Sequence, residues 1–319
     1  AAIDDDGYAA LAPFQWPQRA GTTPSTTRFF ADGGFFTPDG RARFIATPVR
    51  RPATATSEAY PLMLNTGRIR DQWHTMTRTG KAPRLMAGEP EPFLAIHPAD
   101  AVRHSLGDGM LACVESTHGS TICRVRISED QRPGDVFAPM HWTGQFASRA
   151  RIGALVGGAC DPVSGQPEMK LTPVAIAPAR MAWHGFAVSV TAPRLENWAY
   201  FATAPLRGGH RLELADTREP EDWEHLARGV LGAPADRAAE MLAYRDRASG
   251  QHRFALFDTD RLIGALFVAR APLAISRSWA CDRIGAAIAP AERLRLLAGR
   301  PGAAAVDKGP IVCACHEVG

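Results

Sequence analysis

The chain has 319 residues, of which 45% are hydrophobic and 22% are charged, and its formal net charge is +3. These values are typical of a soluble globular protein with room for two domains. A charge of this size does not indicate a nucleic-acid partner, and no apolar run reaches the roughly 20 residues of a membrane helix. Six sparse, irregularly spaced cysteines favour a reducing compartment, so we expect a cytoplasmic protein.

The first 59 residues are rich in Pro, Gly and Thr and predict a connector. Turn signals at residues 32–34 and 38–40 separate pairs of phenylalanines, which predicts short hairpin strands over residues 28–44. The chain starts with Ala1 rather than Met and shows no export signal. Processing or an origin inside a longer protein would explain this start, and we expect an interior piece.

Residues 60–180 are dominated by short strand patterns. We expect strands at residues 60–64, 93–96, 110–114, 120–127 and 136–140, a short helix at residues 97–102, and a hairpin turn at residues 117–119. Many short strands with few helices favour a closed β-barrel. Four prolines indicate an extended tail towards the end of this region: Pro162, Pro167, Pro173 and Pro178.

Residues 181–310 predict a smaller α+β module. Acidic residues open the segment 219–228 and Arg228 ends it, which predicts a helix with a complemented dipole. Further helices are expected at residues 234–244 and 289–297, and a strand hairpin at residues 252–257 and 261–269. The module contains no glycine-rich nucleotide fingerprint, so we expect a packing or docking role for it.

The most informative stretch is residues 64–80, where an apolar strand pattern ends in Asn65-Thr66-Gly67. Arg68, Arg70, Arg78 and Lys81 follow, interleaved with Trp73, His74 and threonines. Guanidinium groups, hydroxyls, a backbone turn at glycine and an aromatic ring together suit a pyrophosphate and a purine-like base. A solvated basic loop after a buried strand is the alternative interpretation.

Five sequence pieces, in order, resemble the molybdopterin-dinucleotide-binding domain of the molybdenum oxidoreductase family, and within it the assimilatory nitrate reductases. They are Asn65-Thr66-Gly67-Arg68 with Gln72-Trp73-His74-Thr75, Ile96-His97-Pro98-Ala99-Asp100-Ala101, Gly107-Asp108-Gly109, Val136-Phe137-Ala138-Pro139-Met140-His141-Trp142, and Asp161-Pro162-Val163-Ser164-Gly165-Gln166-Pro167-Glu168-Met169-Lys170. The resemblance spans about residues 29–176. It implies a fold that is mainly β and α+β, with a six-stranded double-psi β-barrel followed by the smaller α+β domain.

The resemblance also implies the cofactor-binding residues. Residues 66–75 would wrap a guanine-dinucleotide arm of the bis-molybdopterin guanine dinucleotide cofactor of molybdenum, and Lys170 matches another contact position. Gly153 stands where relatives place an asparagine, which removes a side-chain amide from the site. The expected cofactor-binding set is Asn65, Thr66, Gly67, Arg68, Gln72, Trp73, His74, Thr75, Gly153 and Lys170, with no catalytic residue in this chain.

Cys313 and Cys315 form a second clue near the carboxyl end. Two thiolates one residue apart can face one metal centre, and soft sulfur ligands suit iron–sulfur clusters. Residues 311–319 resemble the opening of a bacterioferritin-associated-ferredoxin-like [2Fe–2S] domain. A reactive or structural thiol pair is the alternative for Cys313 and Cys315 taken alone.

The resemblance implies part of a molybdenum-dependent nitrate reductase that converts nitrate to nitrite. No Cys-x-x-Cys group occurs in the chain, so the ligands of a [4Fe–4S] cluster would lie elsewhere in the parent protein, and we expect this piece to be inactive alone. The electron donor would be a ferredoxin, a flavodoxin or an NAD(P)H-dependent reductase component. A formate dehydrogenase or other member of the family, and a non-catalytic cofactor-binding module, are the alternatives.

Overall fold

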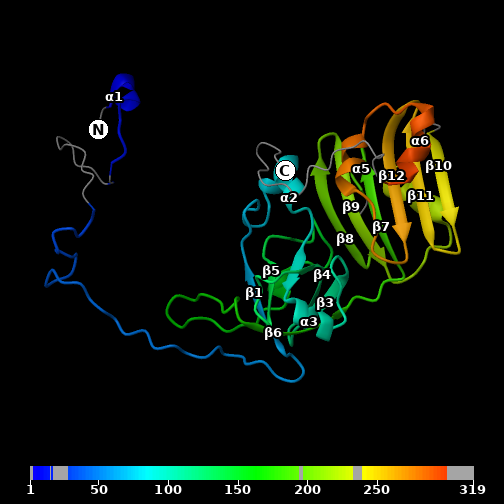
Figure 1. Ribbon diagram of the computed structural model, residues 1–319. Helices are drawn as coiled ribbons and strands as arrows, with labels where there is room; N and C mark the ends of the chain where they lie inside the picture. The colour runs from blue at the N-terminus through cyan, green and yellow to red at the C-terminus, as the bar shows by residue number, and fades with distance from the viewer. Residues whose placement is uncertain (1–2, 15, 17–27, 194–196, 233–238, 300–319) are drawn as a thin grey trace. The chain divides into compact units, whose positions relative to one another are not determined.

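The computed structural model describes residues 3–14, 16, 28–193, 197–232 and 239–299. The chain divides into two units, Ala1–Arg51 and Pro52–Gly319. The described part of the first unit holds one short helix, α1 (Asp5–Ala9), which is capped by the side chain of Asp4. All further elements belong to the second unit (Figure 1).

Six strands form a closed barrel in the order β1-β5-β2-β4-β3-β6. They are β1 (Leu62–Gly67), β2 (Phe93–Ile96), β3 (Leu111–Glu115), β4 (Ser120–Ile127), β5 (Asp135–Pro139) and β6 (Thr172–Pro178). The pairs β1–β5 and β2–β4 are parallel, and the other neighbours are antiparallel. The barrel predicted from the short strand patterns is therefore confirmed.

The barrel interior is filled by aliphatic side chains from all six strands. Leu64, Leu94, Val136 and Val174 are fully buried there. Helix α3 (Pro98–Arg103) adds Ala101 to this core, and a 3-10 turn, η1 (Thr79–Lys81), and a short helix, α2 (Pro83–Gly88), lie between β1 and β2. His97 caps α3 by accepting the backbone N–H of Ala99 at 3.1 Å, so the helix begins at the residue that the Pro98 signal predicts.

A second, antiparallel sheet of six strands follows in the order β10-β11-β12-β7-β9-β8. Its strands are β7 (Trp183–Ser189), β8 (Tyr200–Leu206), β9 (Gly209–Asp216), β10 (Glu240–Asp246), β11 (Gln251–Asp258) and β12 (Arg261–Ala269). Helix α4 (Trp223–Leu231) packs on one face of the sheet, and α5 (Arg277–Arg283) and α6 (Pro290–Leu297) pack on the other.

Charged side chains join the barrel to this sheet. Arg124 of β4 makes two hydrogen bonds of 3.0 Å to Glu91, and the Tyr200 hydroxyl of β8 donates to Glu91 at 2.8 Å. Glu213 of β9, only 2% exposed, binds Arg211 and Arg277 and lies 3.5 Å from Arg124. Burial opposes ionisation of Glu91, but Arg124 and Tyr200 together hold its pKa below the usual range.

Several expected elements differ in the structure. The helix predicted at residues 234–244 is wrong, since Glu240–Asp246 is the edge strand β10, paired along β11; residues 234–238 lie outside the described part. The helix-favouring Met241, Leu242 and Ala243 follow the open edge of β11 instead, because sheet pairing overrides local propensity. Strands β7, β8 and β9 were not predicted.

The hairpin strands predicted at residues 28–44 are also wrong. Residues 28–40 form turns, and residues 41–50 belong to none of the helices or strands described for this chain. Phe30, Gly33 and Gly40 have positive φ, and the N–H of Phe35 bonds to the carbonyl of Gly40 at 2.9 Å. The phenylalanines pack on one another across this turn rather than along a strand pair.

Candidate functional site

The predicted cofactor loop leaves the barrel where β1 ends beside β5. Thr66 pairs with Ala138 in parallel register, and its hydroxyl donates to the Ala138 carbonyl at 2.8 Å. The Thr66 carbonyl accepts the ammonium group of Lys170 at 2.8 Å. The structure therefore brings together two predicted site residues that are about a hundred positions apart in the sequence.

Gly67 is closely packed at this point. A Cβ there would lie 3.3 Å from the Phe137 ring and 3.5 Å from Nζ of Lys170. The Gly67 carbonyl accepts the N–H of Met140 at 3.0 Å. The backbone of Gly67 is thus fixed from β5, and a larger residue would require the Phe137 ring to shift by a few tenths of an ångström.

His141 ties both ends of the loop to the body of the barrel. Its Nε2 accepts the N–H of Ile69 at 3.0 Å, and its Nδ1–H donates to the His74 carbonyl at 2.6 Å. Burial lowers the pKa of His141, and the nearby positive charge of Arg68 lowers it further. A neutral imidazole protonated at Nδ1 satisfies both bonds at once.

The outer surface of the loop carries the groups that could contact a ligand. The guanidinium of Arg68 lies 5.9 Å from the centroid of the Trp73 ring, and Trp73 and His74 meet edge to face at 4.5 Å. Trp73 is half exposed. Asn65 and Thr75 are exposed as well. His74 and Met76 both have positive φ, so the backbone turns sharply between the exposed ring and the buried Met76.

Gln72 points inward rather than to this surface. Its amide N–H₂ contacts Sδ of Met86 at 3.1 Å, and its Oε1 accepts the Thr79 hydroxyl at 2.7 Å. Because the side chain is only 3% exposed, Gln72 holds the loop to α2 and the turn η1, and it presents no amide at the surface.

Gly153 lies in a 3-10 turn, η2 (Ile152–Ala154), that packs beside the β3–β4 hairpin. The Ser116 hydroxyl donates to the carbonyl of Leu155 at 2.7 Å, and a Cβ on Gly119 would lie 2.7 Å from the Ala154 carbonyl. A Cβ added to Gly153 itself would meet no atom within 4 Å. The position therefore has room for a β-carbon.

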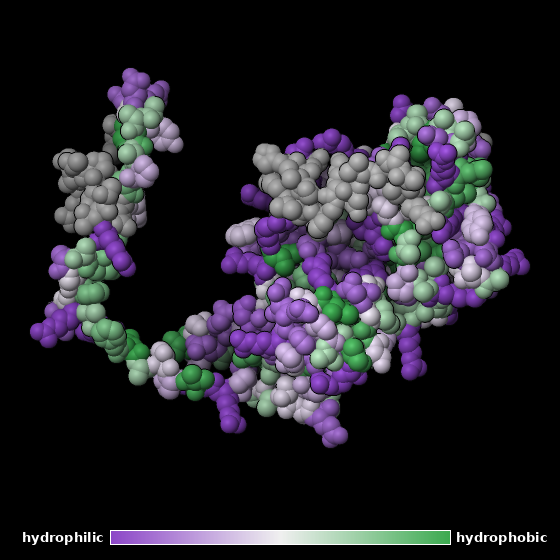
Figure 2. Space-filling view, in the orientation of Figure 1, coloured by the Kyte–Doolittle hydropathy of each residue, from purple (hydrophilic) through white to green (hydrophobic). Residues whose placement is uncertain are grey.

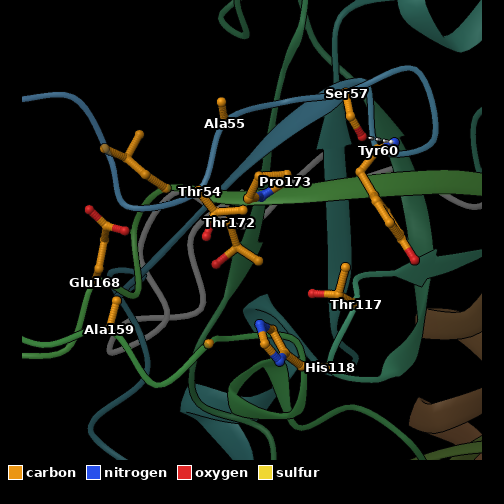
Figure 3. Close-up of a pocket in the computed structure, with 12 residues that line it drawn as sticks. Thr54, Ala55, Ser57, Tyr60, Thr117, His118, Ala159, Glu168, Thr172 and Pro173 are labelled. Atoms are coloured by element: carbon orange, nitrogen blue, oxygen red, sulfur yellow. Dashed lines mark hydrogen bonds between the residues drawn. The ribbon is translucent and has the colours of Figure 1, made fainter.

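A cavity of about 230 Å³ lies near this hairpin. Figure 3 shows Thr117 and His118 on one side of it and Thr172 and Glu168 on the other. The Glu168 carboxylate accepts the N–H of Ala53 at 3.0 Å, so part of its hydrogen-bonding capacity is already used. None of the residues lining the cavity comes from residues 65–75, so this hollow is separate from the exposed surface of the loop.

The cysteines divide into two groups. Cys313 and Cys315 lie outside the described residues. Burial raises the pKa of the Cys123 thiol to about 12. The thiol is therefore neutral at physiological pH and packs as a small apolar side chain in the core. Apolar neighbours predict burial of Cys113, Cys123 and Cys160. Cys123 is buried, Cys113 is partly buried, and Cys160 is exposed in the segment between η2 and β6. No cluster of three His, Cys, Asp or Glu side chains suited to a metal ion occurs in the part of the chain that the structure describes.

Comparisons with known proteins agree with this geometry. The family described as "Molydopterin dinucleotide binding domain" matches residues 62–173, which run from β1 to the start of β6. The match contains the loop after β1, Lys170 and Gly153. The family match therefore covers the closed barrel as far as the start of β6 and lies within the region of the sequence resemblance.

The chain is also similar to nitrate reductases. It is 37% identical to "Nitrate reductase" of Klebsiella oxytoca over 99% of this chain and 35% of that protein. It is 34% identical to "Assimilatory nitrate reductase catalytic subunit" of Bacillus subtilis over 51% of this chain and 22% of that protein. "Periplasmic nitrate reductase" of Desulfovibrio desulfuricans is 35% identical over 45% of this chain and 18% of that protein. The chain thus spans about a third or less of the length of these relatives.

His141 is the main site residue that the predicted set missed. It lies in the quoted piece Val136-Phe137-Ala138-Pro139-Met140-His141-Trp142, so its position was marked, but its role was not. A histidine directly after a buried strand that ends beside β1 was the available signal.

No helix among the described ranges is long and apolar enough to cross a membrane.

Proposed function

We propose that this chain is the cofactor-binding part of a molybdenum-dependent nitrate reductase, and that the loop after β1 holds a guanine-dinucleotide arm of bis-molybdopterin guanine dinucleotide. The observation that carries the proposal is the placement of Arg68 and Trp73 at the open end of the β1–β5 pair, inside the region that matches the dinucleotide-binding family. Nitrate as the substrate is supported by the similarity to nitrate reductases over nearly the whole chain.

The residues present fit such a group. Gly67 ends β1 without a side chain that would crowd Phe137, and the next residue, Arg68, is exposed where a phosphate could approach. Lys170 and Arg68 supply positive charge at this point, and arginine can bind a phosphate through two parallel hydrogen bonds. The half-exposed Trp73 ring offers a flat face for a guanine base.

The chain's own residues would bind and orient, without reacting. His141 fixes the loop backbone from Ile69 to His74, so the exposed groups keep one geometry before the cofactor arrives. Gln72 holds the same loop from inside. When bound, the molybdenum centre would supply the two electrons that reduce nitrate to nitrite.

The finer parts of the proposal rest on the resemblance. The barrel is proposed to be of the double-psi type, which its two parallel and four antiparallel pairings support. Cys313 and Cys315 are proposed to begin a [2Fe–2S] domain, and the parent protein to carry a [4Fe–4S] cluster as well. We propose an assimilatory, cytoplasmic enzyme that takes electrons from a ferredoxin, a flavodoxin or an NAD(P)H-dependent component, with no nucleic-acid or membrane partner.

The test is the substitution Arg68→Ala in the longer parent protein. Loss of one charge-assisted contact to phosphate is expected to weaken cofactor retention about tenfold or more. The measurement is the guanosine monophosphate released by acid hydrolysis per polypeptide after exhaustive dialysis, together with nitrite formed from nitrate by a chemical electron donor.

Arg207→Ala is the matched control, because Arg207 is an exposed arginine in the turn between β8 and β9. The control is expected to retain the guanine content of the unmodified protein. Equal retention in Arg68→Ala would remove the loop from the binding site. Absence of nitrite formation in the unmodified, cofactor-loaded protein would overturn the nitrate reductase assignment itself.

A further inference from the structure

The described residues between 3 and 51 form no core of their own. None of them is buried, whereas the barrel and the second sheet each enclose a set of fully buried aliphatic and aromatic side chains. Ten of the seventeen large apolar side chains exposed in the described residues lie between Ile3 and Val49. Figure 2 shows hydrophobic residues at the surface of this segment. Exposure of so many apolar groups in one short segment is typical of an interaction surface.

Residues 28–40, which we name the aromatic turn, are the part of this surface that internal contacts hold in one conformation. Gly34 N–H bonds to the Asp32 carboxylate at 3.0 Å, and Gly40 N–H bonds to the Thr37 carbonyl at 3.0 Å. Phe30 and Phe35 stack at 4.9 Å, with Phe36 edge-on to Phe30 at 5.2 Å. Since these contacts already order the turn, little conformational entropy remains to be lost when the rings are covered.

Residues 41–49, which we name the arm, follow the aromatic turn, and their first four residues alternate as in a strand although they pair with no described sheet. Arg41 and Arg43 alternate with Ala42 and Phe44, which places Phe44 and Ala42 on one face of an extended chain. Phe44 is 99% exposed and Ile45 is 79% exposed. Extended segments with alternating apolar side chains commonly bind by adding a strand to the edge of a sheet.

The length of the relative from Klebsiella oxytoca points to an occupant for both elements. Its similarity extends over 99% of this chain, yet this chain accounts for only 35% of that protein. About two thirds of a protein of that length therefore lies outside the structure described. We infer that the aromatic turn and the arm dock into that outside part, where an apolar groove receives Phe36 and Phe44 and acidic groups at its rim pair with Arg41 and Arg43. This inference rests on the proposed membership of a longer nitrate reductase.

Hydrogen–deuterium exchange of residues 28–49 tests it, in the 319-residue chain and in the longer parent protein. We expect exchange of the arm amides to slow by about a hundredfold or more in the longer protein, because edge pairing and burial protect backbone N–H groups. Equally fast exchange in both proteins would overturn the inference. Slow exchange already in the 319-residue chain, dependent on its concentration, would overturn it in favour of a second copy as the occupant.

Substitutions give an independent readout. Phe44→Ser in the longer protein is expected to lower its Tm by several degrees and to restore fast exchange in the arm, and to leave the Tm of the 319-residue chain unchanged. Val163→Ser is the matched control, because Val163 is equally exposed at 95% but lies outside this segment. Identical Tm values for Phe44→Ser and Val163→Ser in the longer protein would contradict docking.

Nitrite formation by the longer protein is measured separately. Nitrate reduction with an unprotected arm would refute the docking and leave the proposed function intact. A protected arm in a protein that does not reduce nitrate would support the docking and refute the proposed function.

Discussion

Arg124 at the junction of barrel and sheet and Arg68 after β1 lie in opposite surroundings. Arg124 is enclosed with Glu91, Glu213 and the Tyr200 hydroxyl, so its charge is neutralised inside the protein. Arg68 is exposed, and the contact described for it is the Trp73 ring. In the sequence both are arginines in or next to a predicted strand, each with a second arginine two residues on. Only the carboxylates of Glu91 and Glu213, which the fold brings to Arg124 from distant segments, distinguish an arginine that joins two modules from one that can receive an anion.

The largest expected effect is at the junction. Glu213→Gln would leave the partly buried Arg211 and Arg277 without the buried carboxylate that pairs with them, which is expected to lower the free energy of unfolding by about 3–5 kcal/mol. Urea denaturation followed by tryptophan fluorescence measures this. Glu219→Gln is the control, because Glu219 and Arg270 are each about half exposed and such pairs contribute about 1 kcal/mol or less. Equal losses in both variants would show that the buried cluster does not join the modules.

A smaller effect is expected from protonation of His141. Its pKa is lowered in the folded state, so between that lowered value and the ordinary value near 6.5 the unfolded chain binds more protons than the folded one. The stability that the neutral ring supplies is therefore fully present above about pH 6.5 and is lost as the pH falls through this window. We expect His141→Gln to reduce the decrease in urea midpoint between pH 7 and pH 5.

The control for this measurement is His225→Gln, since His225 is exposed on α4. It should follow the unmodified protein at every pH. Parallel curves for His141→Gln and the unmodified protein would mean that the loop is not held by a neutral imidazole.

The smallest effect on stability is expected at Gly153. Gly153→Asn adds a side chain where a Cβ meets no atom within 4 Å, so the free energy of unfolding should change by no more than about 0.5 kcal/mol. Gly67→Ala is the comparison, because its Cβ would lie 3.3 Å from Phe137, and we expect it to cost about 1–3 kcal/mol by overpacking. Tighter guanine retention by Gly153→Asn in the longer protein would place that position in the cofactor site.

Local signals predicted the parts of the fold that local chemistry determines. The strand at residues 93–96 and the helix after His97 were predicted within a residue, because an apolar run and an Xaa-Pro boundary act over a few positions. Strand β6 was read as an extended tail because of Pro173 and Pro178. Its pairing with β1 and β3 tolerates Pro173, which stands opposite Met63, and the Met63 N–H bonds to the Gly134 carbonyl instead.

The candidate site shows the same division. Arg68, Trp73 and Gly67 were marked by residue type, whereas the positions of Lys170 and His141 beside them depend on how β5 and β6 close the barrel. Gln72 shows the reverse, since an amide in a ligand-binding pattern turned out to face Met86 and Thr79. Residue type indicates what a side chain can do, but the direction in which it points is decided by pairing between distant segments.

The closed barrel has a consequence for synthesis of the chain. β1 pairs with β5 on one side and with β6 on the other, and Leu62 meets Val174 across more than a hundred residues. While the chain emerges from the ribosome, β1 must remain without its second neighbour until Thr172 has been made. Long-range closure of this kind slows folding. A chaperone therefore has the longest time to bind β1 and its unpaired edge while the chain is still shorter than 172 residues.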